Sequence, residues 1–177
     1  MINEDLKFLK ELQEELKTQD HDCQAAPRFW VIMDYEWQVT AEGYHDRVMI
    51  CDPEIGETLE AKEYVSWVFD NLSDLALTEK DIKTLKEDVS SGKYSEADII
   101  AWAEDRWCDV FYEKSVPVIQ PNTMFLTKQE AKYHLEANSH HYSDKAHTYA
   151  MTALRAPKVE RLLKILETFD WDKVVIK

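Results

Sequence analysis

Glycine is scarce in this chain: three glycines occur in 177 residues, at positions 43, 56 and 92. The dinucleotide-binding fingerprint and the P-loop each need several glycines in a short window, because the backbone must approach the phosphates closely. Both motifs are therefore excluded. The sequence also lacks a Gly-x-Ser-x-Gly elbow, so nothing in it supports a hydrolase triad.

Cysteine is equally sparse, and long apolar runs are missing. Cys23, Cys51 and Cys108 are far apart and include no Cys-x-x-Cys pair, which predicts three reduced structural thiols instead of a disulfide frame or a zinc knuckle. No stretch approaches the roughly 18 apolar residues of a membrane span. The first five residues have neither the basic start nor the apolar run of a secretory signal. We therefore expect a cytoplasmic protein with no membrane partner.

The residues that are abundant predict a folded acidic protein. Six Trp, eight Tyr and six Phe, within a hydrophobic content of 45%, are enough for a sizeable core. Charged residues make up 32% of the chain and its net charge is −14. Because this hydrophobic content is that of a globular protein, the charge does not indicate disorder and must lie on a folded surface.

That charge is divided unevenly along the chain. Residues 1–121 carry 12 Lys and Arg against 28 Asp and Glu, a net of −16, whereas residues 122–177 carry 9 against 7. Four of the six histidines also lie in the C-terminal part. We predict an acidic α+β body over 1–121 and a C-terminal β-α-β-α unit over 122–177, either in one compact domain or as two closely packed subdomains.

Hydrophobic periodicity and capping residues predict the elements of an α+β fold. The pattern favours an N-terminal helix over 4–18 and a β-hairpin from strands 28–40 and 44–51, followed by a strand over 110–119. Central helices are expected over 59–72, over 78–89 and from residue 95. The C-terminal unit is predicted as strand 123–126, helix 127–138, strand 147–154 and a helix from Pro157. We expect a small mixed sheet, with the last two strands parallel if they pair directly.

Acidic side chains recur on the outer faces of the central helices. A polyanionic surface repels nucleic acid and attracts the proteins that bind it. We therefore predict a protein-binding surface that includes Glu63, Asp70, Asp74, Glu87, Asp88, Glu104 and Asp105.

The segment 134–155 is the densest set of chemically useful side chains, and four interpretations stay open. A metal would take its ligands from His134, His140 or His141, Asp144 and His147, although the spacing matches no zinc signature. A metal-free phosphodiesterase would use His140, His141, His147, Lys145 and Arg155 as acid, base and phosphate-binding cations. A nucleic-acid surface would stack bases on Tyr142 and Tyr149 and position phosphates with Lys145 and Arg155. In the fourth, His134 and His147 are packing residues, and we predict neither a resident metal nor a cofactor.

Residues 124–169 resemble the C-terminal signature of an uncharacterised protein family carried by phages and integrative elements of Gram-positive bacteria. The resemblance covers about a quarter of the chain and includes a Phe-Leu-Thr start, His-Tyr-Ser, His-Thr-Tyr-Ala and Arg-x-Pro. The matching positions are Phe125, Leu126, Thr127, Ala131, His134, Asn138, His141, Tyr142, Ser143, His147, Thr148, Tyr149, Ala150, Arg155 and Pro157. The family brings no assigned reaction.

The resemblance implies a mobile-element protein, and acidic proteins of that kind include inhibitors of host defence nucleases. A Cas9-type enzyme holds nucleic acid in a positively charged channel, for which a carboxylate-rich surface can compete. We therefore expect a non-catalytic anti-CRISPR inhibitor whose partner is a nuclease such as Cas9. The alternative is a nucleic-acid-binding or nuclease-like module that contacts RNA or DNA through the C-terminal cluster. The oligomeric state stays open, with Tyr35, Trp37 and Tyr44 as candidate dimer contacts.

Overall fold

The computed structural model describes residues 3–20, 26–53, 56–71, 83–84, 87–88 and 90–174. Asp74, one of the predicted binding residues, lies outside the described residues, as do Cys23 and most of the helix predicted over 78–89. Within the described residues, no helix is both long enough and apolar enough to span a membrane.

A five-stranded antiparallel sheet is the centre of the fold, which confirms the α+β class. The strands are β1 (Arg28–Thr40), β2 (Arg47–Asp52), β3 (Glu57–Glu60), β4 (Asp109–Ile119) and β5 (His147–Thr152). Their order in the sheet is β3-β2-β4-β1-β5. Pro117 lies two residues before the end of β4, where its missing N–H costs the ladder least.

The strand pairing differs from the sequence prediction in two places. A hairpin does follow the N-terminal helix, but β2 and β3 form it, and β4 lies between β2 and β1. Residues 123–126 form no strand; Phe125 makes one isolated antiparallel bridge to Trp30, and β5 pairs antiparallel with β1. Residues 123–126 and β5 were expected to pair parallel with each other if they were neighbours. In the structure each of them pairs with β1 instead, so this parallel pair does not form.

Packing divides the chain into two units that we describe separately. Unit 1 comprises residues 1–36 and 117–177, and unit 2 comprises residues 37–116. The chain passes from one unit to the other inside β1 and again inside β4. This division differs from the division of charge at residue 121, since the N-terminal helix packs with the C-terminal residues.

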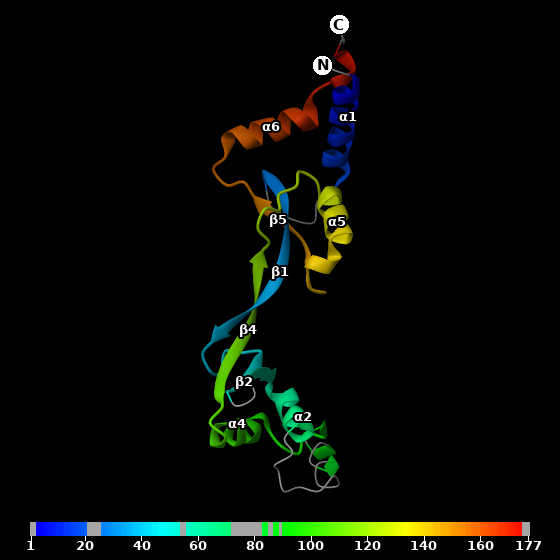
Figure 1. The fold of residues 1–177 in the computed structure, drawn as a ribbon. Coiled ribbons are helices and arrows are strands. Elements are labelled where there is room, and N and C mark those ends of the chain that lie inside the picture. Colours follow the sequence, from blue (N-terminus) through cyan, green and yellow to red (C-terminus); the bar gives the residue numbers. More distant parts are fainter. Residues whose placement is uncertain are drawn as a thin grey trace. The chain divides into compact units, whose positions relative to one another are not determined.

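Unit 1 is held by helices from both ends of the chain. Helix α1 (Asn3–Thr18) contacts α6 (Pro157–Thr168), and Figure 1 shows the two in blue and in orange to red. Leu16 of α1 is buried with Leu163 and Leu166 of α6. The leucine spacing of α1 and the proline at the first position of α6 explain why both helices form where the sequence predicts them. A second cluster buries Trp30, Ile32 and Ala131, the last from helix α5 (Lys128–Ala137).

Unit 2 packs two helices against β2 and its neighbours. Helix α2 (Ala61–Asn71) and helix α4 (Glu96–Asp105) contact each other, and α2 also contacts β2 and β3. The core is formed by Val48, Ile50, Ala61, Tyr64, Val65, Val68, Ile99, Ala103 and Cys108. Ser95 and Asp98 form the predicted capping box at the start of α4. The helix predicted from residue 59 begins at Ala61, because Leu59 and Glu60 pair with β2 as part of β3.

Candidate functional site

His134 is a packing residue in the structure. Thr127 caps the start of α5 by accepting a hydrogen bond from the Glu130 N–H at 3.2 Å, and the helix carries His134 in its last turn. The imidazole Nε2 lies 2.9 Å from the hydroxyl of Tyr142, and the ring centroid lies 5.0 Å from that of Phe125. These contacts hold Tyr142 against the cluster of Trp30 and Ala131. Both His134 and Tyr142 are thus used in joining α5 to the segment that follows it.

The residues between α5 and β5 are held by a carboxylate that no sequence pattern singles out. Asp34 of β1 is 6% exposed and accepts hydrogen bonds from the hydroxyl and from the N–H of Ser143, the latter at 2.9 Å. It also accepts a hydrogen bond from the Tyr35 N–H at 2.8 Å. Burial by itself raises the pKa of Asp34, but the hydrogen bonds from Ser143 and Tyr35 outweigh it and hold this pKa below its ordinary value. Asp34 is therefore a charged anchor for the turn at 143–146.

The remaining histidines of the segment are exposed. His140 and His141 lie in a short 3-10 helix (Ser139–His141), with ring centroids 4.0 Å apart. His147 begins β5, and its Nδ1 lies 3.0 Å from the carbonyl oxygen of Lys145. No group of three or more His, Cys, Asp or Glu side chains within the described part of the chain is arranged to hold a metal ion.

The predicted phosphate-binding residues are only partly brought together. His147 and Tyr149 lie two residues apart on β5, which places both side chains on one exposed face. The ammonium of Lys145 lies 5.7 Å from the ring centroid of Tyr35, beside that face. Arg155 is exposed in the turn between β5 and α6, where its backbone has φ 58°. Tyr142 packs inward on His134, so its ring does not lie on the exposed face with Tyr149.

The predicted acidic residues lie mainly on the outward faces of α2 and α4. Glu63 and Asp70 are exposed on α2, and Glu104 and Asp105 are exposed at the end of α4. Glu63 and Asp70 are seven residues apart, which is two helical turns, so they share one face. Glu63, Glu104 and Asp105 make no ion pair with any residue that the structure describes. In contrast, Glu87 pairs with Lys83 at 4.0 Å and Asp88 pairs with Lys93 at 2.5 Å.

Unit 2 carries most of the negative charge of the protein. Its residues 37–116 include 8 Lys and Arg against 19 Asp and Glu, a net of −11, whereas unit 1 has 13 against 16 and a net of −3. This negative charge also acts on a tyrosine of the unit. The pKa of Tyr112 is raised first by burial and then by the charges of Glu42, Glu104 and Glu96. Carboxylates from the β1–β2 connection and from both ends of α4 therefore act on the same place.

A buried polar network lies beneath these acidic helices. The hydroxyl of Tyr64 donates to Asp52 at 2.7 Å and lies 3.0 Å from the Cys108 sulfur, while Arg106 is 3.6 Å from Asp52. Burial raises the pKa of Tyr64 and also that of Cys108. A thiol with a raised pKa is a poor nucleophile, so we assign this network to stability. Sequence reasoning missed it because its members lie far apart along the chain.

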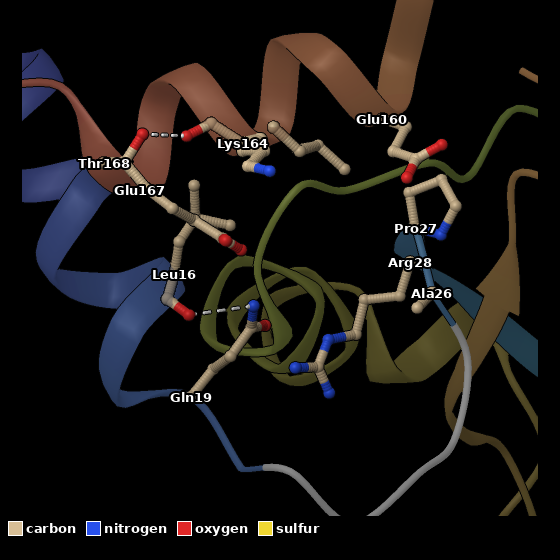
Figure 2. A pocket seen from close by; sticks show the side chains of 10 residues that line it. Leu16, Gln19, Ala26, Pro27, Arg28, Glu160, Lys164, Glu167 and Thr168 are labelled. Carbon is tan, nitrogen blue, oxygen red and sulfur yellow. Dashed lines mark hydrogen bonds between the residues drawn. The ribbon is translucent and has the colours of Figure 1, made fainter. Parts of the chain in front are cut away.

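Unit 1 also contains a cavity of about 400 Å³ between the end of α1, the start of β1 and α6. Figure 2 shows side chains of both charges in its lining, which consists of Leu16, Gln19, Ala26, Pro27, Arg28, Glu160, Leu163, Lys164, Glu167 and Thr168. The side-chain amide of Gln19 donates to the Leu16 carbonyl at 3.4 Å, and its oxygen accepts from the indole of Trp30 at 2.9 Å. Three of the lining side chains, Gln19, Arg28 and Thr168, hydrogen-bond to backbone carbonyl oxygens, and the cavity holds none of the predicted site residues.

Comparison with known proteins gives no match: no family model, curated protein or solved structure is similar to this chain.

Proposed function

We propose that the protein is an accessory protein of a phage or mobile element that inhibits a host nucleic-acid-handling defence enzyme of the Cas9 type. It acts by protein binding, through the carboxylates of α2 and α4. The observation that carries this proposal is the group of exposed carboxylates Glu63, Glu104 and Asp105, which make no ion pair within the described residues and lie in a unit with net charge −11. Such an enzyme binds nucleic acid in a positively charged channel, and works in the cytoplasm, where we place this protein.

The physical basis is competition for positive charge. Carboxylates without partners of their own can approach Lys and Arg side chains without first breaking an ion pair. Charges of one sign on one unit also steer association, which makes the association rate depend on ionic strength. Binding of this kind needs no nucleophile, metal or cofactor in the inhibitor.

A nuclease inhibition assay tests the proposal. Stoichiometric protein is expected to inhibit DNA cleavage by a Cas9 enzyme from a Gram-positive host, less strongly as salt is raised. The variant Glu63→Gln/Glu104→Gln/Asp105→Asn keeps the side-chain shapes and removes three charges, and should weaken inhibition by about tenfold or more. The matched control Asp144→Asn/Glu160→Gln/Glu167→Gln removes three exposed charges from unit 1 and should inhibit like the wild type. Cleavage that is unaffected by an excess of wild-type protein would overturn the Cas9 proposal.

The alternative is nucleic-acid binding by the C-terminal residues of unit 1. It is favoured by the shared exposed face of His147 and Tyr149, with Lys145 beside them. Titration of labelled single-stranded RNA, single-stranded DNA and duplex DNA separates the two proposals. Binding that weakens with salt and disappears in His141→Ala/His147→Ala/Arg155→Ala would support the alternative and contradict a purely protein-directed inhibitor.

A further inference from the structure

Trp107 of unit 2 is 88% exposed, more than any other large apolar side chain in the described part of the chain. It lies in the turn between α4 and β4, one residue after the C-cap Arg106. A tryptophan that packs inside a protein buries about 150–250 Å² of surface, so folding leaves most of this indole unused. The core of unit 2 therefore does not account for a tryptophan at this position.

The backbone of Trp107 is also unfavourable for a large side chain. The Cys108 N–H donates to the Ala103 carbonyl at 3.1 Å, and the Trp107 N–H donates to the Glu104 carbonyl at 2.9 Å. These two bonds form a Schellman motif, in which the residue at the place of Trp107 is left-handed and is usually glycine. Trp107 has φ 62° accordingly. An exposed aromatic side chain kept on such a backbone is typical of a contact with another molecule.

Negative charge surrounds Trp107 in the sequence. Three exposed carboxylates lie within three residues of it: Glu104, Asp105 and Asp109. None of the three makes an ion pair with a residue that the structure describes. The cation of the same turn is used inside the unit, because Arg106 lies 3.6 Å from Asp52 and donates to the Tyr64 hydroxyl at 3.4 Å. The turn thus presents an indole together with carboxylates that are available to a partner.

This combination favours a cationic protein surface as the partner. The face of an indole attracts Arg and Lys side chains, and carboxylates attract the same side chains, so both features act on one kind of surface. A second copy of the chain would oppose like charges around Trp107. Nucleic acid and an anionic membrane are repelled by a unit of net charge −11.

We propose that Trp107 is the anchor residue of the protein-binding surface of unit 2, and that its indole enters an apolar hollow rimmed by Arg or Lys side chains on the partner. The inference rests on the proposed function and deepens it, because it names the kind of place on the enzyme that the inhibitor occupies. Tryptophan is among the residues that most often dominate the energy of an interface. The carboxylates then set the rate of association, and burial of the indole sets the rate of dissociation.

Binding of the full chain to the Cas9 enzyme of the inhibition assay, followed by surface plasmon resonance at several salt concentrations, tests the proposal. Trp107→Gly removes the indole and suits the left-handed backbone, so it should keep the fold. It is expected to raise Kd by about thirtyfold or more, mainly through faster dissociation. The control Tyr133→Ala removes an aromatic side chain that is 62% exposed on α5 of unit 1, and should bind like the wild type.

A second pair of variants separates the indole from the charges around it. Trp107→Phe keeps an aromatic ring and should recover part of the affinity that Trp107→Gly loses. Glu104→Gln/Asp105→Asn keeps the indole, and should slow association and make its rate less sensitive to salt. Trp107→Gly, in contrast, should leave the salt dependence of association as in the wild type.

The outcomes distinguish this inference from the proposed function. A wild-type protein that does not bind the enzyme would overturn both, whereas wild-type binding that is unchanged in Trp107→Gly would overturn this inference alone. Sedimentation equilibrium and sedimentation with phosphatidylserine vesicles examine the other occupants. A dimer or vesicle binding that is lost in Trp107→Gly would assign the indole to that contact and overturn the proposal.

Discussion

Each unit of the protein contains a buried aspartate among its described residues, but the two units use it differently and present different surfaces. Unit 1 buries Asp34 to hold the backbone of a turn through Ser143, and its net charge is close to balanced. Unit 2 buries Asp52 against Tyr64 and Arg106, and carries most of the negative charge outside. The difference indicates which groups remain for a partner. In unit 1 the prominent polar side chains His134, Tyr142 and Ser143 are occupied in packing, whereas unit 2 leaves carboxylates exposed.

The largest expected effect comes from removing the buried carboxylate of unit 2. Asp52→Ala removes the acceptor of the Tyr64 hydroxyl and the ion-pair partner of Arg106, and should lower the free energy of unfolding by about 3 kcal/mol. Chemical denaturation measures the loss, and hydrogen exchange should place it in residues 37–116. Asp105→Ala, on the exposed face of the same unit, is the control and should change stability by no more than about 0.5 kcal/mol. Equal losses in the two variants would contradict the assignment of Asp52 to the core.

A smaller and pH-dependent effect is expected from Asp34 in unit 1. Asp34→Ala removes the acceptor of both Ser143 donors and should cost about 2 kcal/mol at neutral pH. The pKa of Asp34 is lower in the folded state than its ordinary value of 3.8, so the folded protein binds fewer protons there than the unfolded chain. The stabilisation is therefore complete above the unfolded value, and is lost as pH falls from 3.8 through the folded pKa.

Acid titrations of the wild type and of Asp34→Asn check this prediction. The wild type should lose stability more steeply than the variant below pH 3.8, and the two curves should run parallel at neutral pH. Parallel curves through the acid range would show that the carboxylate of Asp34 does not stabilise the turn.

The smallest effect concerns backbone strain, which we compare at one exposed residue of each unit. Trp107 in unit 2 and Arg155 in unit 1 have φ 62° and 58°, in the left-handed region where a Cβ is unfavourable. Trp107→Gly and Arg155→Gly should each stabilise the protein by about 0.5 kcal/mol, net of the greater chain entropy of glycine. Matched thermal or chemical denaturation would detect both. If one of the two substitutions destabilises the protein, the side chain it removes makes contacts that outweigh the backbone strain.

The helices and strands could be predicted where local signals agree. The leucines of α1, the Thr127 cap of α5 and Pro157 at the start of α6 each act within a few residues, and these elements lie where the sequence predicts them. The partners of the strands could not be predicted. Val48 and Tyr112 pair across 64 positions, so the neighbours of β2 depend on a contact that no local pattern encodes.

The candidate site divides in the same way. The exposed carboxylates of α2 and α4 follow from helical periodicity, because a helix that buries one stripe must expose the opposite one. The roles of His134 and Ser143 could not be predicted from periodicity, because they depend on contacts with Tyr142 and with Asp34 respectively. Asp34 is 109 residues from Ser143 along the chain.

The sequence by itself determined that the protein is acidic, that its core is rich in aromatic residues, that it has no glycine-rich phosphate loop, and where its amphipathic helices lie. The tertiary structure decided which polar side chains are used in packing and which remain exposed. Burial and hydrogen bonding depend on distant partners, as Asp52 with Arg106 and Asp34 with Ser143 illustrate. Charge and periodicity are local properties, whereas the availability of a charged group depends on what folds against it.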